Sequence, residues 1–264
     1  GAWCGGYRSG AYKDGVKITP VVTIVLNFSR PVGGKPAMLS WDETETYFHE
    51  FGHALHNFFA DGHYRRTSRS VPRDFVELPS QVMENWAGEP EVLKVYAKHY
   101  ETGVPIPDEL IEKMQRSSKF NQGFATVGFV SSALIDLEFH TQPASASRDV
   151  AAFEKAELEK IGMPAEIALR HRPTQFGHIF SGDHYASGYY SYMWSEVMDA
   201  DAFGAFEEAG DIFDPATAKR LLDDIYSSGG SVDPEAAYVA FRGREPEPDA
   251  LLRRRGLLQT PEAA

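Results

Sequence analysis

The sequence is poor in cysteine, in long apolar runs and in basic charge, and each shortage excludes a class of protein. Cys4 is the only cysteine among 264 residues, so no intrachain disulfide, Cys-rich zinc module or CxxC redox motif can form. The longest apolar stretch, residues 21–26, is interrupted by Thr23 and falls far short of the ~20 residues that span a membrane. Lysine and arginine number 26 against 38 aspartates and glutamates, and this net charge of −12 disfavours nucleic acid or anionic lipid as a partner.

The remaining composition is that of a folded protein. Hydrophobic residues make up 42% and charged residues 24%, which excludes disorder for most of the chain. A length of 264 residues suits one large domain or two small ones. The first residue is Gly1 and not Met, so we expect a processed, cloned or excised segment of a longer protein. The acidic balance suits the cytoplasm, and the periplasm remains the alternative, because such a segment does not report its own targeting signal.

Local patterns predict helices after a short β-region. Residues 1–15 are rich in glycine and aromatics and are interpreted as a loop, whereas residues 19–28 are β-branched and predict a strand. Residues 41–60 carry apolar side chains at three- and four-residue spacing, which predicts a helix with one apolar stripe. The stripe consists of Phe48, Phe51, Leu55, Phe58 and Phe59.

A second helix is predicted at about residues 74–87, with a core stripe of Phe75, Leu78, Val82 and Trp86. Most of the remaining chain also has helical patterns. Breaks are expected at 103–107, 142–147, 162–164 and 227–230, where glycine, proline and serine gather. The sequence therefore predicts a mainly α protein with a small β-sheet near its N-terminus.

Residues 49–53 form the motif HExxH inside the predicted helix 41–60. Residues four apart lie one above the other on a helix, so His49 and His53 can chelate one zinc ion. Glu50 is rotated by about 100° from His49 and lies beside the metal, where a general base belongs. Zinc lowers the pKa of a water that it binds toward ~7, and Glu50 can accept the proton. His56 lies two turns from His49, too far to share the ion, and is assigned to the helix surface or to a supporting role.

The third protein ligand that catalytic zinc requires must come from another segment, because the extended HExxHxxGxxH pattern is absent. Glu77 lies 24 residues after His53, enough for one helix to end, a loop to turn and a second helix to pack back. Glu77, Gln81 and Glu84 share one face of that second helix. Glu77 is the nominated ligand. Glu84 is either the alternative ligand or a partner of a ligand imidazole.

Residues 176–194 combine two histidines, four tyrosines and three glycines. Peptide hydrolysis at zinc builds negative charge on the scissile carbonyl, and a tyrosine hydroxyl or an imidazolium can donate a hydrogen bond to it. Flanking glycines let such a donor move when substrate binds. Tyr185 is the favoured donor, Tyr192 a second one, and His178 a functional candidate. For Tyr189 the alternative is plain aromatic packing at a helix start.

These three segments together resemble the thimet oligopeptidase and peptidyl-dipeptidase (dipeptidyl carboxypeptidase) family of zinc metallopeptidases. The segments that carry the resemblance are residues 45–56, residues 74–81 and the tyrosine-rich segment that ends at 192–197. Weaker similarity covers nearly the whole chain. The resemblance implies a zincin-like helical catalytic domain with a small sheet and an active site in a channel between two halves. Because members are much longer, residues 1–264 look like their C-terminal catalytic portion.

That portion would divide into three parts. Residues 1–40 would form a loop and small sheet, residues 41–90 the zinc-binding helices, and residues 91–264 a helical region with a Tyr/Gly-rich substrate loop. The resemblance implies one Zn²⁺, short peptides as substrates and the N-terminal half of the same parent protein as a partner. The implied residues are the zinc ligands His49, His53 and Glu77, the base Glu50, the carbonyl donors Tyr185 and Tyr192, and the substrate contact His178, with His184 and Tyr189 as further substrate-binding candidates.

Three functions follow from these patterns. The first is a peptidase that releases C-terminal dipeptides, the branch that the spacing between His178 and Tyr185 favours. The second is an endo-acting oligopeptidase with the same chemistry. The third is a zinc-stabilised segment that has no turnover without its N-terminal half.

Overall fold

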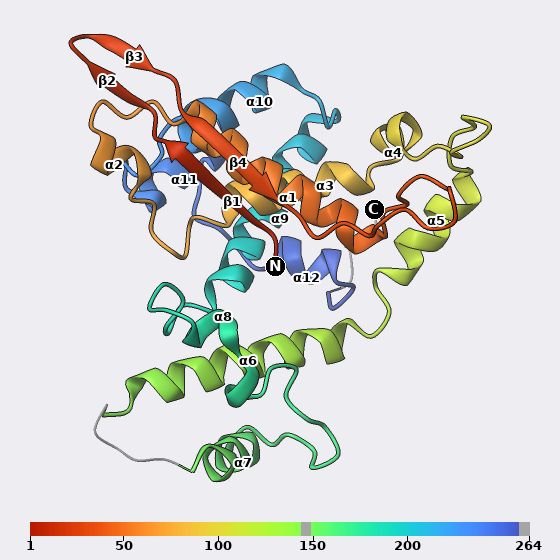
Figure 1. Cartoon of the computed structure of the whole chain (residues 1–264), viewed down its shortest axis with the longest axis vertical. Helices are drawn as coiled ribbons and strands as arrows, with labels where there is room; N and C mark the ends of the chain where they lie inside the picture. Colours follow the sequence, from red (N-terminus) through yellow and green to blue (C-terminus); the bar gives the residue numbers. More distant parts are fainter. Residues whose placement is uncertain (144–148, 259–264) are drawn as a thin grey trace.

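The computed structural model describes residues 1–143 and 149–258, in which helices predominate beside two small sheets (Figure 1). The strands are β1 (Trp3–Arg8), β2 (Ala11–Lys13), β3 (Val16–Ile18) and β4 (Val21–Val25). The helices before the mid-chain gap are α1 (Trp41–Phe59), α2 (Arg65–Arg69), α3 (Leu78–Gly88), α4 (Pro90–Tyr96), α5 (Asp108–Ser117) and α6 (Gln122–Thr141). After it come α7 (Val150–Lys160), the 3₁₀ turn η1 (Pro173–Gln175), α8 (Gly177–Phe180), α9 (Ser191–Ala209), α10 (Pro215–Arg220), the π-helical η2 (Leu221–Tyr226), α11 (Pro234–Arg242) and α12 (Asp249–Arg254).

Both sheets are antiparallel pairs at the N-terminal end of the chain. β1 pairs with β4, with a bulge between Gly6 and Arg8, and this pair lies along α1 (Figure 1). β2 and β3 form a hairpin whose turn residues Asp14 and Gly15 both have positive φ, 51° and 79°. An Asp-Gly pair with two positive φ angles matches the twist of the flanking strands, so the hairpin closes without strain.

Helix α1 starts at a capping box. The Ser40 hydroxyl accepts a hydrogen bond from the Glu43 backbone N–H at 3.2 Å, and the Glu43 carboxylate accepts one from the Ser40 N–H at 2.7 Å. The two bonds satisfy N–H groups that have no partner inside the helix. The same carboxylate accepts from the Ser29 backbone, so the cap also ties the loop after β4 to α1.

Helices α1 and α3 pack together at Gly52. A Cβ atom on Gly52 would lie 2.5 Å from the Pro79 carbonyl oxygen and 2.7 Å from the Ser80 Cα atom, so only glycine allows this approach. The Tyr226 hydroxyl donates a hydrogen bond to the same Pro79 carbonyl at 2.7 Å. The contact brings the N-terminal end of α3 against the middle of α1.

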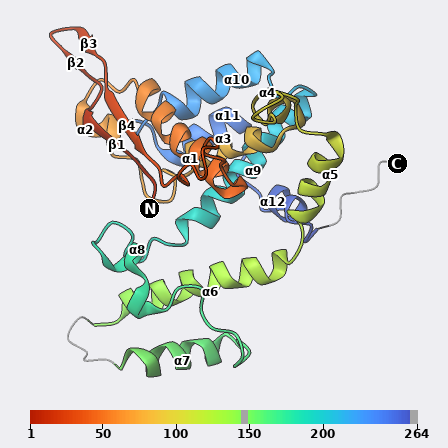
Figure 2. The ribbon, with the colours of Figure 1, turned by 45° about the vertical axis from the view of Figure 1, so that its right-hand side comes forward.

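The main core surrounds α3 and α9. Phe75, Leu78 and Val82 are buried, and Trp86 packs against them with its ring 5.0 Å from that of Phe206, as the predicted stripe requires. Residues from η2 and α11 complete this core. Helices α6 and α7 form a separate layer, and in two views this layer lies apart from the helices that pack around α9 (Figure 2). No helix within the described residues is long and apolar enough to cross a bilayer.

The fold confirms the mainly α prediction with a small N-terminal sheet, and it corrects three details. The loop expected at 1–15 is wrong, because β1 and β2 lie there. The helix expected from residue 74 begins at Leu78, and the four residues before it form turns. Within 103–107, 162–164 and 227–230 the chain is not α-helical, as expected, and most of the break at 142–147 lies outside the described residues.

The third correction concerns the apolar stripe of α1. Phe51, Phe58 and Phe59 are about two-fifths exposed, whereas Leu55 of the same stripe packs against the main core, so only part of the stripe contributes to it. The buried positions of α1 are instead Glu50, Gly52, Ala54 and His56. Gly52 is buried because α3 packs against it, and apolar periodicity alone does not reveal a contact made at a glycine.

The close contact at Gly52 yields a stability prediction. Gly52→Ala should lower the free energy of unfolding by about 1–3 kcal/mol, because the added methyl group meets backbone atoms that have no room to move. The matched control is Gly123→Ala on α6, where nothing lies within 4 Å of the added Cβ and a helical alanine should be neutral or stabilising by up to about 1 kcal/mol. Urea unfolding of both variants measures the difference. Equal stabilities would contradict the tight contact.

Candidate metal centre

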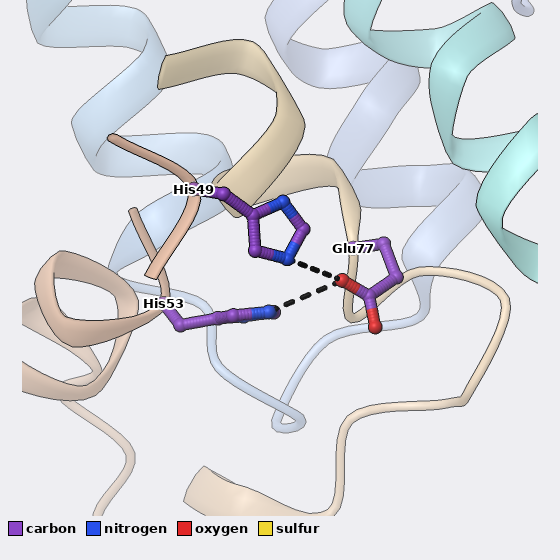
Figure 3. A group of neighbouring side chains, drawn as sticks. All are labelled: His49, His53 and Glu77. Carbon is purple, nitrogen blue, oxygen red and sulfur yellow. Dashed lines mark ion pairs between the residues drawn. The ribbon is translucent and has the colours of Figure 1, made fainter. Parts of the chain in front are cut away.

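Two imidazoles of α1 and one carboxylate at the start of α3 point at one another (Figure 3). The His49 and His53 Nε2 atoms lie 3.3 and 3.1 Å from Oε2 of Glu77. The two rings are nearly perpendicular, at 87°, with centroids 4.8 Å apart. The i, i+4 spacing of α1 sets this arrangement, and the contact at Gly52 brings Glu77 to it.

Glu77 is held firmly in this position. It is 2% exposed and occupies the N-cap of α3, where the Ser80 hydroxyl donates to its Oε2 at 3.2 Å. Burial alone would raise the pKa of Glu77, but hydrogen bonds from His49 and His53 hold that pKa well below its usual range. The carboxylate therefore stays ionised and available as a ligand.

Glu84 contacts the other nitrogen of His49. Its Oε1 lies 2.6 Å from His49 Nδ1, so Nδ1 carries a proton and donates it. This leaves Nε2 facing His53 and Glu77, the orientation that a carboxylate partner gives to a ligand imidazole. Burial lowers the pKa of His49, but its contacts with Glu77 and Glu84 outweigh burial and raise that pKa to about 10. Of the two roles left open by the sequence, Glu84 adopts that of imidazole partner.

This donor set fits zinc. Two imidazole nitrogens and one carboxylate oxygen lie within 4.8 Å of one another, and catalytic zinc sites use three protein ligands of these types. Within residues 1–143 and 149–258, His49, His53 and Glu77 are the one group of three or more His, Cys, Asp or Glu residues arranged in this way.

Glu50 lies on α1 close to His49 and His53. It is 5% exposed, and its Oε2 has no hydrogen-bond partner. Burial raises the pKa of Glu50, against the opposing effect of the imidazoles of His49 and His53. A buried carboxylate oxygen without a donor is poised to accept a proton from another molecule.

A chain of hydrogen bonds leads from Glu77 to the tyrosine-rich segment. The Tyr185 hydroxyl donates to Glu77 Oε1 at 3.0 Å, and the Tyr192 hydroxyl donates to the Tyr185 oxygen at 2.9 Å. His178 Nε2 lies 3.0 Å from the Tyr192 oxygen, and since the Tyr192 proton is already used, Nε2–H is the donor there. Burial and the nearby Glu77 raise the pKa of both tyrosines, so they remain protonated donors. Burial lowers the pKa of His178.

Two of the sequence candidates lie outside this hydrogen-bond chain. The His184 side chain is 81% exposed, and its Nδ1 lies 3.9 Å from Oδ1 of Asp183. The Tyr189 ring is packed, stacked on Phe129 with centroids 5.0 Å apart and edge-on to Phe176 at 4.8 Å. Tyr189 still lines a cleft of about 1680 Å³ together with Gln81, Glu84, His178 and Tyr192.

His56 is neither on the helix surface nor in the ligand group. It is 4% exposed and packs edge-on against Tyr226, with ring centroids 6.1 Å apart. Burial lowers the pKa of His56 to about 4, so it is a neutral core residue. The surface expectation is wrong, because η2 packs over this part of α1.

Two residues near the tyrosines were not singled out from the sequence. The Arg73 guanidinium lies over the Tyr185 ring, 4.4 Å from its centroid. Asp136 of α6 is fully buried and accepts hydrogen bonds from the backbone of the segment that follows Tyr185. The one sequence signal for Asp136 is a charge inside the otherwise apolar run 133–137, and no signal indicates Arg73.

Comparison with known proteins places these features in a family. Residues 1–257 match peptidase family M3. The chain is 40% identical to dipeptidyl carboxypeptidase of Salmonella typhimurium and 41% identical to that of Escherichia coli, each over 261 residues that are 97% of this chain and 38% of the relative. It is 42% identical to oligopeptidase A of Escherichia coli over 265 residues, again 97% of this chain and 38% of the relative. The chain thus spans less than two-fifths of the length of these relatives. The match over nearly all of its residues shows that the chain belongs to peptidase family M3.

Proposed function

We propose that this chain is the C-terminal catalytic portion of a zinc-dependent peptidase that cleaves short peptides and releases C-terminal dipeptides. The observation that carries the proposal is the convergence of His49, His53 and Glu77 with the unpartnered carboxylate oxygen of Glu50 beside them. The match to peptidase family M3 supports it.

His49, His53 and Glu77 would hold the zinc ion, and Glu84 would fix the orientation of His49. When bound, zinc supplies Lewis acidity, which lowers the pKa of water and polarises a carbonyl group. The contact of α1 with α3 at Gly52 would keep the three side chains within reach of one ion.

Glu50 would act as general base. Its Oε2 would take a proton from the attacking water and pass that proton to the leaving nitrogen, so that an amine departs. Burial helps, because the raised pKa of Glu50 brings this carboxylate closer to the working pH.

Tyr185 and Tyr192 would exchange their present bonds, to Glu77 and to the Tyr185 oxygen, for hydrogen bonds to the carbonyl oxygen as negative charge builds on it. Their raised pKa values keep both protons in place at neutral pH. His178 would hold Tyr192 through Nε2–H and contact the substrate at the edge of the cleft. His184 and Tyr189 remain further candidates for substrate binding, the first from an exposed loop and the second from the cleft wall.

The relatives carry two kinds of name, dipeptidyl carboxypeptidase and oligopeptidase, so an endo-acting enzyme is the second candidate function. A third is a zinc-binding segment without turnover, which the 38% coverage of the relatives favours. In that case the N-terminal half of the parent protein is the partner that completes the channel. We propose a cytoplasmic location, with the periplasm as the alternative.

The base assignment predicts that Glu50→Gln keeps zinc and loses about 10²–10⁴-fold in turnover, because the amide cannot accept the proton. Zinc content and cleavage of a short peptide are measured on the same preparation. The matched control is Glu43→Gln at the start of α1, which weakens the cap and leaves the site intact. Full activity in Glu50→Gln would refute the assignment.

The orientation of His49 predicts that Glu84→Gln weakens zinc binding about 10–100-fold, because the imidazole loses its ionised partner. Competition with a chelator of known affinity measures the loss. Glu91→Gln on exposed α4 is the control and should bind zinc like the parent chain. Unchanged affinity in Glu84→Gln would show that the fold alone orients the ring.

The substrate class is tested by blocking the peptide C-terminus. An enzyme that releases C-terminal dipeptides must bind the free carboxylate through charge-assisted hydrogen bonds, so an amidated peptide should be cut about 10–100-fold more slowly. Mass spectrometry of the products identifies the bond that is cut. Equal cutting of both peptides at internal bonds indicates the endo-acting enzyme. An uncut peptide, in the presence of bound zinc, indicates the segment that needs its N-terminal half.

A further inference from the structure

The segment between α8 and α9 carries Tyr185 but consists of turns. Residues 181–190 contain no regular helix, and few backbone hydrogen bonds support them. A turn after Tyr185 is closed by a bond from the Gly188 N–H to the Tyr185 carbonyl at 2.9 Å. Ser187, inside this turn, has φ = 58°, a left-handed conformation that costs a non-glycine residue energy. Some other contact must stabilise the turn.

That contact is the carboxylate of Asp136 on α6. The side chain is 0% exposed, and each of its oxygens accepts one backbone hydrogen bond from the segment. Oδ1 accepts from the Ser187 N–H at 3.0 Å, and Oδ2 accepts from the Tyr189 N–H at 2.9 Å. His140, one turn further along α6, approaches Oδ1 with Nδ1 at 2.8 Å. The buried charge is therefore fully hydrogen-bonded.

We propose that Asp136 is a positioning residue that holds Tyr185 at the metal centre. The carboxylate accepts hydrogen bonds from the N–H groups of Ser187 and Tyr189, two and four residues after Tyr185. These two bonds stabilise the left-handed conformation of Ser187. Charge-assisted bonds in a buried setting are among the stronger hydrogen bonds in proteins. The inference rests on the proposed function, because it gives the Tyr185 hydroxyl a role in the reaction.

The location of Asp136 supports this role over a purely structural one. A buried aspartate inside an apolar helix is costly, and an apolar side chain would suffice to pack α6. Both backbone N–H groups that donate to Asp136 belong to the segment between α8 and α9 that carries Tyr185. Helix α6 lies in the layer apart from α1 and α3, so Asp136 links that layer to the metal centre (Figure 2).

The test is a double-mutant cycle with Asp136→Asn and Tyr185→Phe. The first substitution keeps the size of the side chain but turns an NH₂ group toward one backbone N–H, so one of the two bonds is lost. We expect Asp136→Asn to lower kcat about tenfold or more with KM nearly unchanged, and Tyr185→Phe to lower kcat about 10²-fold or more. The double variant should match Tyr185→Phe alone, because Asp136 acts through Tyr185. A double variant that loses the product of the two single effects would overturn the proposal.

Hydrogen exchange supplies a second measurement that does not need turnover. The Ser187 and Tyr189 amides should be protected in the parent chain and exchange about tenfold or more faster in Asp136→Asn. Glu138→Gln, which breaks an ion pair of α6 with Lys160 and does not touch the segment, is the matched control and should leave both amides protected. If Asp136→Asn does not fold, hydrogen exchange of the parent chain alone tests the proposal. Unprotected Ser187 and Tyr189 amides in the parent chain would overturn it.

The two arms separate this inference from the proposed function. If Tyr185→Phe retains full activity, the donor role of Tyr185 fails, whatever the amides show. If Tyr185→Phe is impaired but the amides are equally protected in parent and Asp136→Asn, the donor role stands and the positioning role of Asp136 fails.

Discussion

The contact between α1 and α3 at Gly52 is the constraint on which the rest of the site depends. With no side chain at Gly52, the Pro79 carbonyl and the Ser80 Cα atom reach the surface of α1. This approach sets the distance from the two imidazoles to Glu77, the N-cap residue of α3. A larger residue at this point would separate the helices and with them the ligands. Tyr226 supports the contact from the core side through its bond to the Pro79 carbonyl.

Three carboxylates in the candidate site and in the segment that supports it are buried. Glu50, Glu77 and Asp136 are at most 5% exposed, and ionised groups lose favourable hydration when they are buried. Glu77 and Asp136 compensate by accepting hydrogen bonds from imidazoles, hydroxyls or backbone N–H groups. One Glu50 oxygen has no such partner, which distinguishes it from the other two. This missing partner would suit Glu50 for the proposed proton transfer, whereas the carboxylates of Glu77 and Asp136 are already hydrogen-bonded.

The sequence predicted the parts of the site that depend on spacing within one element. His49, His53 and Glu50 followed from the helical period, and the core stripe of α3 followed from the same rule. Glu77 was nominated from its residue type and distance, and Glu84 was left with two roles. The strands at 3–8 and 11–13 were missed because glycines and aromatics outweighed the weak β pattern, although Asp14-Gly15 is a hairpin signal. The apolar stripe of α1 was wrong in part, because Phe51, Phe58 and Phe59 are partly exposed and the close contact with α3 is made at a glycine.

By itself, the sequence determined the class of fold and the two imidazoles, since both depend on short-range periodicity that a single helix imposes. It also supplied the residue types for a third candidate ligand, Glu77, and for the hydroxyl donors near it. The tertiary structure decided which of them meet. Glu77 approaches the imidazoles because Gly52 lets α3 close on α1, and Tyr185 reaches Glu77 in a segment that Asp136 ties down from another layer. These contacts join residues that lie far apart in the sequence, and no local rule of the chain fixes the distance between them.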